Sequence, residues 1–201
     1  MIKQSKILPT GKRIGILSSY NGSGFDAIQK ACEENLLDAQ VVLVISNNST
    51  AKVLQKASDK NIPNFIVNTN RYPDENLDEK ITKMMKEFRV DYIFLSGYMK
   101  KLEKNLVNTF ENRIINSHPA LLPKFGGKGM YGINVHKAVI EANEKESGCT
   151  VHFVNENYDE GEFILQNRFE LNKDETVESL ENRIKDLESK TIVEAFKKLL
   201  A

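Results

Sequence analysis

The sequence predicts an α/β protein with a mostly parallel central sheet. In about the first 120 residues, short apolar runs typical of buried strands alternate with amphipathic segments typical of helices. The apolar runs are continuous, as in parallel strands that are covered on both faces. This alternation favours a doubly wound, Rossmann-like arrangement in which helices cross over between neighbouring strands.

Each element of the first part has its own signal. The run VVLVI at 41–45 is apolar throughout, whereas 77–88 has apolar residues at helical spacing. Ser49 and Thr50 precede the second helix as candidate caps. The expected strands are 13–18, 41–45, 64–67, 91–95 and 113–116, and the expected helices are 25–34, one around 53–57, 77–88 and 102–110.

The pattern changes after the fifth strand. A helix at 135–143 leads to two strands, 150–155 and 163–170, that are joined by a polar turn. A short polar connection between strands is typical of an antiparallel pair. The chain then ends in a long helix from about 176 to 200.

Length and charge limit the function classes. With 201 residues the chain is expected to form a single domain at 13–201, preceded by a flexible lead-in at 1–12. Because the net charge is zero, no overall field attracts nucleic acid or a membrane surface. Cys32 and Cys149 form no CxxC motif and are expected to be buried thiols. With no signal peptide evident, we expect a cytoplasmic protein.

Ligands of doubly wound sheets bind beyond the carboxyl ends of the strands. This rule selects three places: the turn at 19–24, the segment at 96–100 and the stretch at 116–132. The first of these combines a glycine-bearing turn with a helix start, which is a ready anion site for a phosphate group.

Two other interpretations of the glycine turn stay open at this point. Gly22, Gly24 and Ala27 fit the GxGxxA dinucleotide fingerprint, but the second strand ends in Ser-Asn-Asn at 46–48, where that fingerprint requires an acid. A tight turn without a ligand is the second alternative. The phosphate of a substrate is the interpretation that the turn favours most.

The stretch after the fifth strand contains a candidate catalytic pair. Residues two apart on a strand face the same side, so Asn116 and His118 enter one crevice if they end the strand. An amide can donate to an oxyanion, and an imidazole can exchange a proton near neutral pH. Pro119 and Pro123 stiffen the exit, and we expect the glycine-rich loop at 126–132 to act as a lid. A structural histidine is the alternative.

A carboxylate would complete such a site. The turn at 155–162 carries Glu156, Asp159, Glu160 and Glu162. Spacing alone does not decide which of these acids reaches His118.

Two motifs resemble the signatures of folate-dependent formyltransferases. NSHPALLP at 116–123 resembles N-x-H-P-S-L-L-P, and 148–166 resembles the second signature of that family, which contains its catalytic aspartate. The resemblance extends from Arg13 to the last helix. The short length and the NGSG turn look most like the members that formylate glycinamide ribonucleotide, a step of purine biosynthesis.

The resemblance implies an enzyme that uses 10-formyltetrahydrofolate as co-substrate. Three scattered histidines do not form a metal site, so we expect no metal. The resemblance also implies that Asp159 pairs with His118 and raises its pKa. His152 lies on an expected strand among apolar neighbours, so we interpret it as structural. Glu188 would hold the ribose hydroxyls. The implied residues are Asn116, His118 and Asp159 for catalysis, Gly22, Ser23 and Gly24 for the phosphate, and Met99, Lys100, Leu102, Val154 and Tyr158 for the folate.

Three readings remain distinct on the sequence. The first is the formyltransferase, the second a hydrolase (deformylase) in which water replaces the amine, and the third a binding module without turnover. In each case the partners are small molecules, with no nucleic acid and no membrane, and the protein is a monomer or homodimer.

Overall fold

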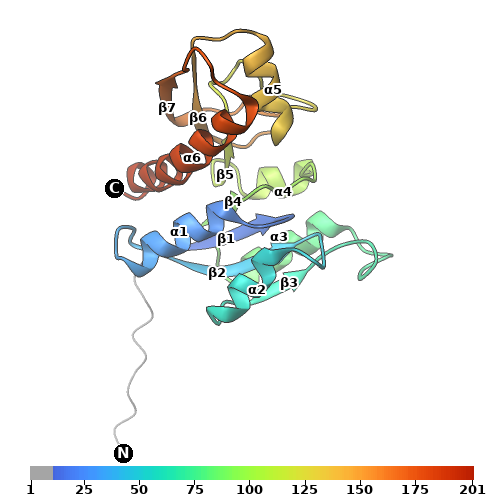
Figure 1. The fold of residues 1–201 in the computed structure, drawn as a ribbon. Helices are drawn as coiled ribbons and strands as arrows, with labels where there is room; N and C mark the ends of the chain where they lie inside the picture. The colour runs from blue at the N-terminus through green and yellow to red at the C-terminus, as the bar shows by residue number, and fades with distance from the viewer. Residues whose placement is uncertain (1–10) are drawn as a thin grey trace, which may run out of the picture.

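The computed structural model describes residues 11–201, and the sheet forms its centre (Figure 1). Seven strands of the described residues pair in the order β3-β2-β1-β4-β5-β6-β7. The first five run parallel and the last two join antiparallel, which confirms the predicted fold class. The strands are β1 (Lys12–Ser18), β2 (Ala39–Ser46), β3 (Asn64–Ile66), β4 (Tyr92–Leu95), β5 (Ile114–His118), β6 (Glu146–Phe153) and β7 (Phe163–Glu170).

The helices agree closely with the apolar periodicity. They are α1 (Ser23–Glu33), α2 (Lys52–Asp59), α3 (Leu77–Glu87), α4 (Lys104–Thr109), α5 (Ile133–Glu141) and α6 (Val177–Leu200). Thr176 caps α6 in a reciprocal pair with Ser179. The predicted cap of α2 is wrong, because Ala51 is its N-cap and the Asn48 carboxamide instead captures the hydroxyl and amide of Thr50 in a turn.

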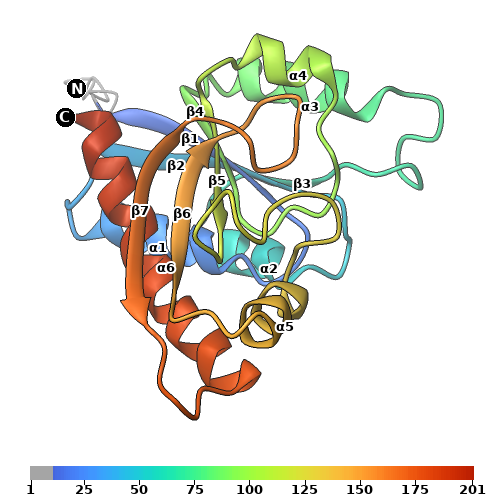
Figure 2. The same cartoon turned by 90° about the horizontal axis from the view of Figure 1, so that it is seen from above.

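Helices cover both faces of the sheet. One apolar core joins the strands to α1, α2 and α6, and a second joins them to α3 and α4. Figure 2 shows α3 and α4 on the opposite side of the sheet from α1 and α6. A smaller cluster packs α5 on the start of α6. Burial on both faces explains why the parallel strands are apolar without alternation.

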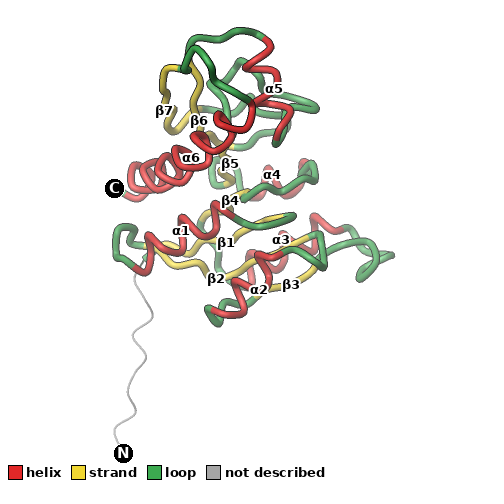
Figure 3. Tube along the Cα trace, viewed as in Figure 1, coloured by secondary structure: helices red, strands yellow, loops and turns green. Residues whose placement is uncertain are grey.

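The strand order reverses between β1 and β4, because β2 and β3 extend the sheet one way and β5 to β7 the other. A crevice for ligands is expected beyond the carboxyl ends of strands at such a switch point. The long loops that follow β5 and β6, drawn green in Figure 3, lie near one another. A hydrogen bond from the Gly127 amide to Asp159 joins these two loops directly.

Residues 1–10 of the predicted lead-in at 1–12 lie outside the described residues. Lys12, the last residue of that range, is the first residue of β1. No helix in residues 11–201 combines the length and apolar character that crossing a membrane requires. Both cysteines are free thiols; Cys149 is buried, whereas Cys32 is partly exposed, contrary to the prediction that both are buried.

Candidate active site

Asn116 and His118 lie at the carboxyl end of β5, as the sequence predicts. His118 is 4% exposed, and its Nε2 lies 2.8 Å from the carbonyl oxygen of Phe125. A carbonyl only accepts hydrogen bonds, so Nε2 carries the proton in this contact. The other ring nitrogen, Nδ1, is therefore the one that faces the remaining groups of the site.

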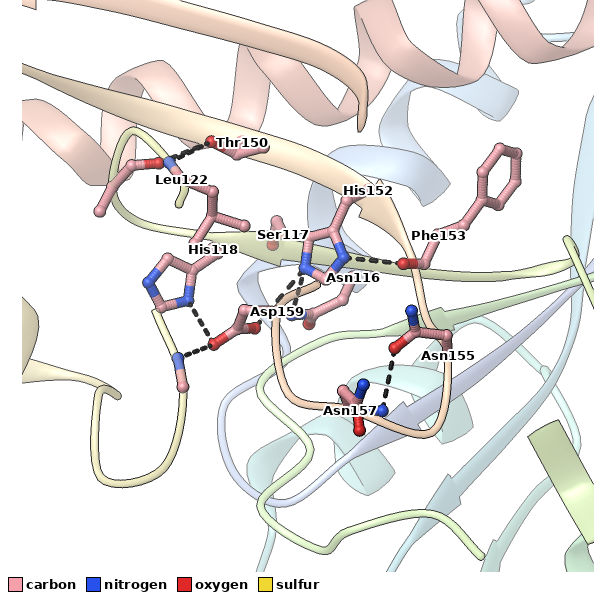
Figure 4. A network of polar contacts seen from close by, with 12 residues as sticks. Asn116, Ser117, His118, Leu122, Thr150, His152, Phe153, Asn155, Asn157 and Asp159 are labelled. Atoms are coloured by element: carbon pink, nitrogen blue, oxygen red, sulfur yellow. Dashed lines mark hydrogen bonds and ion pairs between the residues drawn. The ribbon is translucent and has the colours of Figure 1, made fainter. Parts of the chain in front are cut away.

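Asp159 reaches this histidine from the loop between β6 and β7 (Figure 4). Its Oδ2 lies 3.6 Å from Nδ1 of His118 and accepts the Gly127 amide at 2.9 Å. The backbone of Asp159 has a φ of 58°, a left-handed conformation that aspartate tolerates better than most residues. Among the acids of this turn, the structure thus brings Asp159 to the imidazole.

Burial and partners shift the pKa values of this pair. Burial lowers the pKa of His118, and this effect exceeds the opposing influence of the Asp159 carboxylate and the Phe125 carbonyl. Burial acts to raise the pKa of Asp159, but contacts from His152, His118 and the Gly127 amide together lower it. The Asp159 carboxylate does act to raise the His118 pKa, as expected, but burial outweighs it.

A second histidine completes the constellation. His152 on β6 stands directly opposite Asn116 on β5, and such cross-strand pairs share a face of the sheet. Its Nδ1 donates to the Phe153 carbonyl at 2.8 Å, so in the neutral ring Nε2 accepts from the Asn116 amide at 3.3 Å. Nε2 also lies 3.6 Å from Oδ1 of Asp159. The sequence interpretation of His152 as structural missed these contacts, which only the strand register reveals.

The glycine turn leads into α1, as predicted. Gly22 is the N-cap in a left-handed conformation, and it offers no side-chain cap. The amides of Ser23 and Gly24 find no acceptor within residues 11–201. Two amides left open at a helix start form an anion site, since the helix dipole also favours negative charge there.

Gly24 is fixed by packing. A Cβ atom at this position would lie 2.4 Å from the ring of Phe94 on β4. Only a residue without a side chain lets α1 approach the sheet this closely. The helix start and its open amides are thereby held against the carboxyl end of β4.

Glu188 reaches β5 from α6. Its Oε1 accepts the hydroxyl of Ser117 at 2.6 Å, and Ser117 lies between Asn116 and His118 on β5. Burial raises the pKa of Glu188, and the Ser117 hydroxyl lowers it by less. Because neighbouring residues of a strand face opposite sides, Glu188 contacts β5 on the face opposite to that of Asn116 and His118.

A cleft opens next to Asn116 and Asp159. Of the residues implied for folate binding, four line this cleft, whereas Met99 does not. The sequence also missed neighbours whose position depends on the fold of two loops. The four implied residues are Lys100, Leu102, Val154 and Tyr158, and the missed ones are Leu95, Tyr98, Lys101, His152, Asn155, Glu156 and Asn157.

The remaining histidine stands apart from the catalytic contacts. His136 is buried on α5, and its Nδ1 has no hydrogen-bond partner within residues 11–201. Burial lowers its pKa. In the part of the chain that the structure describes, no group of three or more His, Cys, Asp and Glu side chains is arranged to hold a metal ion.

The fold and the two signatures define a class of proteins. The family model "Formyl transferase" matches residues 12–196. The chain belongs to this family.

Individual relatives narrow the comparison. The chain is 37% identical to the chloroplastic phosphoribosylglycinamide formyltransferase of Arabidopsis thaliana over 92% of its own length but spans only 64% of that protein. It is 33% identical to the phosphoribosylglycinamide formyltransferase of Bacillus subtilis, with 94% of this chain and 95% of that protein covered. The structure of glycinamide ribonucleotide transformylase 1 from Geobacillus kaustophilus aligns with a TM-score of 0.87 at 32% identity, covering 95% and 100% of the two chains.

Proposed function

We propose that this protein transfers the formyl group of 10-formyltetrahydrofolate to the amine of glycinamide ribonucleotide, a step of purine biosynthesis. The observation that carries the proposal is that Asn116 and Asp159 line one cleft and that Asp159 also lies 3.6 Å from the buried His118. The relatives that cover the chain almost completely are named for this reaction.

Asn116 is suited to stabilise the oxygen of the formyl group. A carboxamide nitrogen carries two N–H groups, and His152 occupies one of them. The other N–H is left to donate to the oxygen as it gains negative charge during attack by the amine. Because His152 sets the orientation of the amide, the donor is in place before the reaction, which is what makes such stabilisation effective.

His118 and Asp159 manage the proton. The lowered pKa of His118 makes the ring neutral at neutral pH, and the ionised Asp159 stabilises the cation that forms when the ring takes up a proton. In the reaction, the bond from the amine nitrogen to the formyl carbon forms and the bond from that carbon to the folate nitrogen breaks. The proton lost by the amine passes, through a water held by Asp159, to the departing nitrogen.

For this role, Nε2 of His118 must exchange its hydrogen-bond partner. In the structure its Nε2 proton points at the Phe125 carbonyl. The formyl oxygen replaces that carbonyl when substrate binds, so the loop that begins at Phe125 shifts as the site fills. This supports the expectation that 126–132 acts as a lid.

The substrate groups match the polar surfaces around the site. The phosphate accepts from the open amides of Ser23 and Gly24, beside Gly22. One oxygen of Glu188 is held by Ser117, which leaves the other for the ribose hydroxyls. The folate lies in the cleft, which Lys100, Leu102, Val154 and Tyr158 line, whereas Met99 lies outside its lining.

The test is an assay with both substrates. The purified protein is incubated with 10-formyltetrahydrofolate, with and without glycinamide ribonucleotide, and the absorbance of the deformylated folate is followed. Product that forms only with the ribonucleotide supports the proposal. Formate release without an amine identifies a deformylase instead, and binding without any turnover identifies a binding module.

The remaining expectations belong to the same proposal. One formyltransferase domain at 13–201 acts on small molecules only, as a monomer or homodimer in the cytoplasm. Size-exclusion chromatography with light scattering measures the oligomeric state. The Arabidopsis relative is named as chloroplastic, so the compartment is a separate matter for microscopy of the tagged protein.

A further inference from the structure

Two buried serines face each other across the switch point of the sheet. Ser19 follows β1 directly and is 2% exposed, and Ser96 follows β4 directly and is 5% exposed. Backbone hydrogen bonds join the two strand ends, from the Ser19 amide to the Gly97 carbonyl at 3.2 Å and from the Ser96 amide to the Leu17 carbonyl at 2.8 Å. Each serine therefore begins one of the two segments that frame the crevice.

The hydroxyl of Ser96, which follows β4, bonds to the backbone of α1, which follows β1. It accepts the backbone amide of Phe25 at 3.1 Å, in the first turn of α1. Gly22, the N-cap of this helix, has no side chain for that purpose, so Ser96 caps the helix from a neighbouring strand. This contact fixes the turn that presents the open amides of Ser23 and Gly24.

The hydroxyl of Ser19, which follows β1, bonds to the backbone of the segment that follows β4. It accepts the Met99 amide at 2.8 Å and donates to the Asn47 carboxamide at 2.6 Å. Tyr98 and Lys100, which flank Met99 in sequence, line the cleft beside the catalytic residues. Holding the Met99 amide thus holds one wall of that cleft.

We propose that Ser19 and Ser96 are crossed positioning residues: Ser96, next to the folate loop, orders the phosphate-binding amides, and Ser19, next to the phosphate turn, orders the folate loop. This inference rests on the proposed function for the identity of the two ligands. It follows from geometry, because each hydroxyl bonds the backbone of the opposite segment. Both serines are buried, and neither lines the cleft.

The proposal can be tested, because each serine should affect binding of the substrate whose site lies farther from it in the sequence. Ser96→Ala leaves the buried Phe25 amide without its acceptor, so the KM for glycinamide ribonucleotide rises about fivefold while that for 10-formyltetrahydrofolate stays nearly constant. Ser19→Ala gives the reverse pattern, with a rise of about two- to threefold in the folate KM, because water partly replaces the lost acceptor of a more exposed segment. Calorimetry with the ribonucleotide, and separately with tetrahydrofolate, measures the dissociation constant of each ligand without turnover, so that a change in binding is separated from a change in rate.

Matched variants separate positioning from folding. Ser18→Ala removes a fully buried hydroxyl that lacks a hydrogen-bond partner within residues 11–201, and it leaves both KM values unchanged. Ser19→Thr and Ser96→Thr retain the hydroxyl and restore most of the respective affinity. If wild-type protein transfers formyl groups but each alanine variant weakens both substrates equally, or the nearer one more, the crossed arrangement is overturned. If wild-type protein transfers none, the proposed function fails, and the inference falls with it.

Discussion

The parallel strands β1 to β5 and the antiparallel hairpin of β6 and β7 contribute differently to the site. The parallel part presents backbone at its carboxyl ends: open amides on α1 and the loop after β4. The hairpin brings side chains, since His152 lies on β6 and Asp159 follows it. Under the proposed function, the parallel strands supply the binding surfaces, and the antiparallel hairpin completes the groups that move the proton.

β5 is the strand on which the two contributions meet. It pairs parallel to β4 on one edge and antiparallel to β6 on the other. The antiparallel register sets His152 against Asn116 and Thr150 against His118. A one-residue slip would turn these side chains to the opposite face and disperse the site. The comparison predicts that changes on β5 and in the hairpin affect turnover, whereas changes around β1 to β4 affect binding and stability.

The largest effect is expected from the side chains that handle the proton. His118→Asn and Asp159→Asn each lower kcat by about 10²–10⁴-fold, because general acid–base assistance is lost. Thermal unfolding followed by circular dichroism should change little by comparison. A turnover number that stays within a few-fold of wild type in both variants would remove these residues from the mechanism.

The next effect tests the parallel part. Gly24→Ala places a Cβ 2.4 Å from the Phe94 ring, so we expect a loss of about 1–3 kcal/mol in the free energy of unfolding and weaker binding of the ribonucleotide. Calorimetric unfolding and binding titration measure both quantities. Phe94→Leu shortens the opposing side chain, and the double variant should lose less than the sum of the single variants. If the two losses of stability simply add, contact with the Phe94 ring is not what excludes a side chain at position 24.

A smaller effect is expected from the contact that orients the amide. His152→Phe keeps a ring on β6 but removes the acceptor for Asn116, and kcat should fall about tenfold. His136→Phe is the matched control, since it replaces another buried histidine that makes neither of these contacts, and it should retain its turnover. Equal losses in both variants would mean that His152 serves packing alone.

The sequence predicted the fold well because its signals are local. Continuous apolar runs such as 41–45 and helical spacing such as 77–88 depend only on neighbouring residues, and the structure confirms them. The cap of α2 was missed because the Asn48 side chain accepts both the amide and the hydroxyl of Thr50, which holds Thr50 in a turn before the helix.

The site was predictable only in part. Asn116 and His118 follow from strand alternation, but the choice of Asp159 among four acids came from the resemblance alone. The role of His152 depends on the β5–β6 register, and that of Ser96 on a contact spanning 71 residues. Neither signal exists within a local window of sequence.

The smallest expected effect is a pH dependence of the free energy of unfolding, which arises from the burial of His118 and Asp159. The pKa of His118 is lowered in the folded protein, so below its ordinary value of 6.5 the unfolded chain binds more protons than the folded one. Stability therefore rises with pH in this window and is lost on acidification. The lowered pKa of Asp159 has the same sign at lower pH, near and below its ordinary value of 3.8. Urea unfolding at pH 7 and pH 5 should show a loss for wild type that is smaller in His118→Asn, because that variant has no imidazole to protonate. An equal loss in both proteins would place the acid sensitivity elsewhere and indicate that His118 is solvated more freely than its 4% exposure implies.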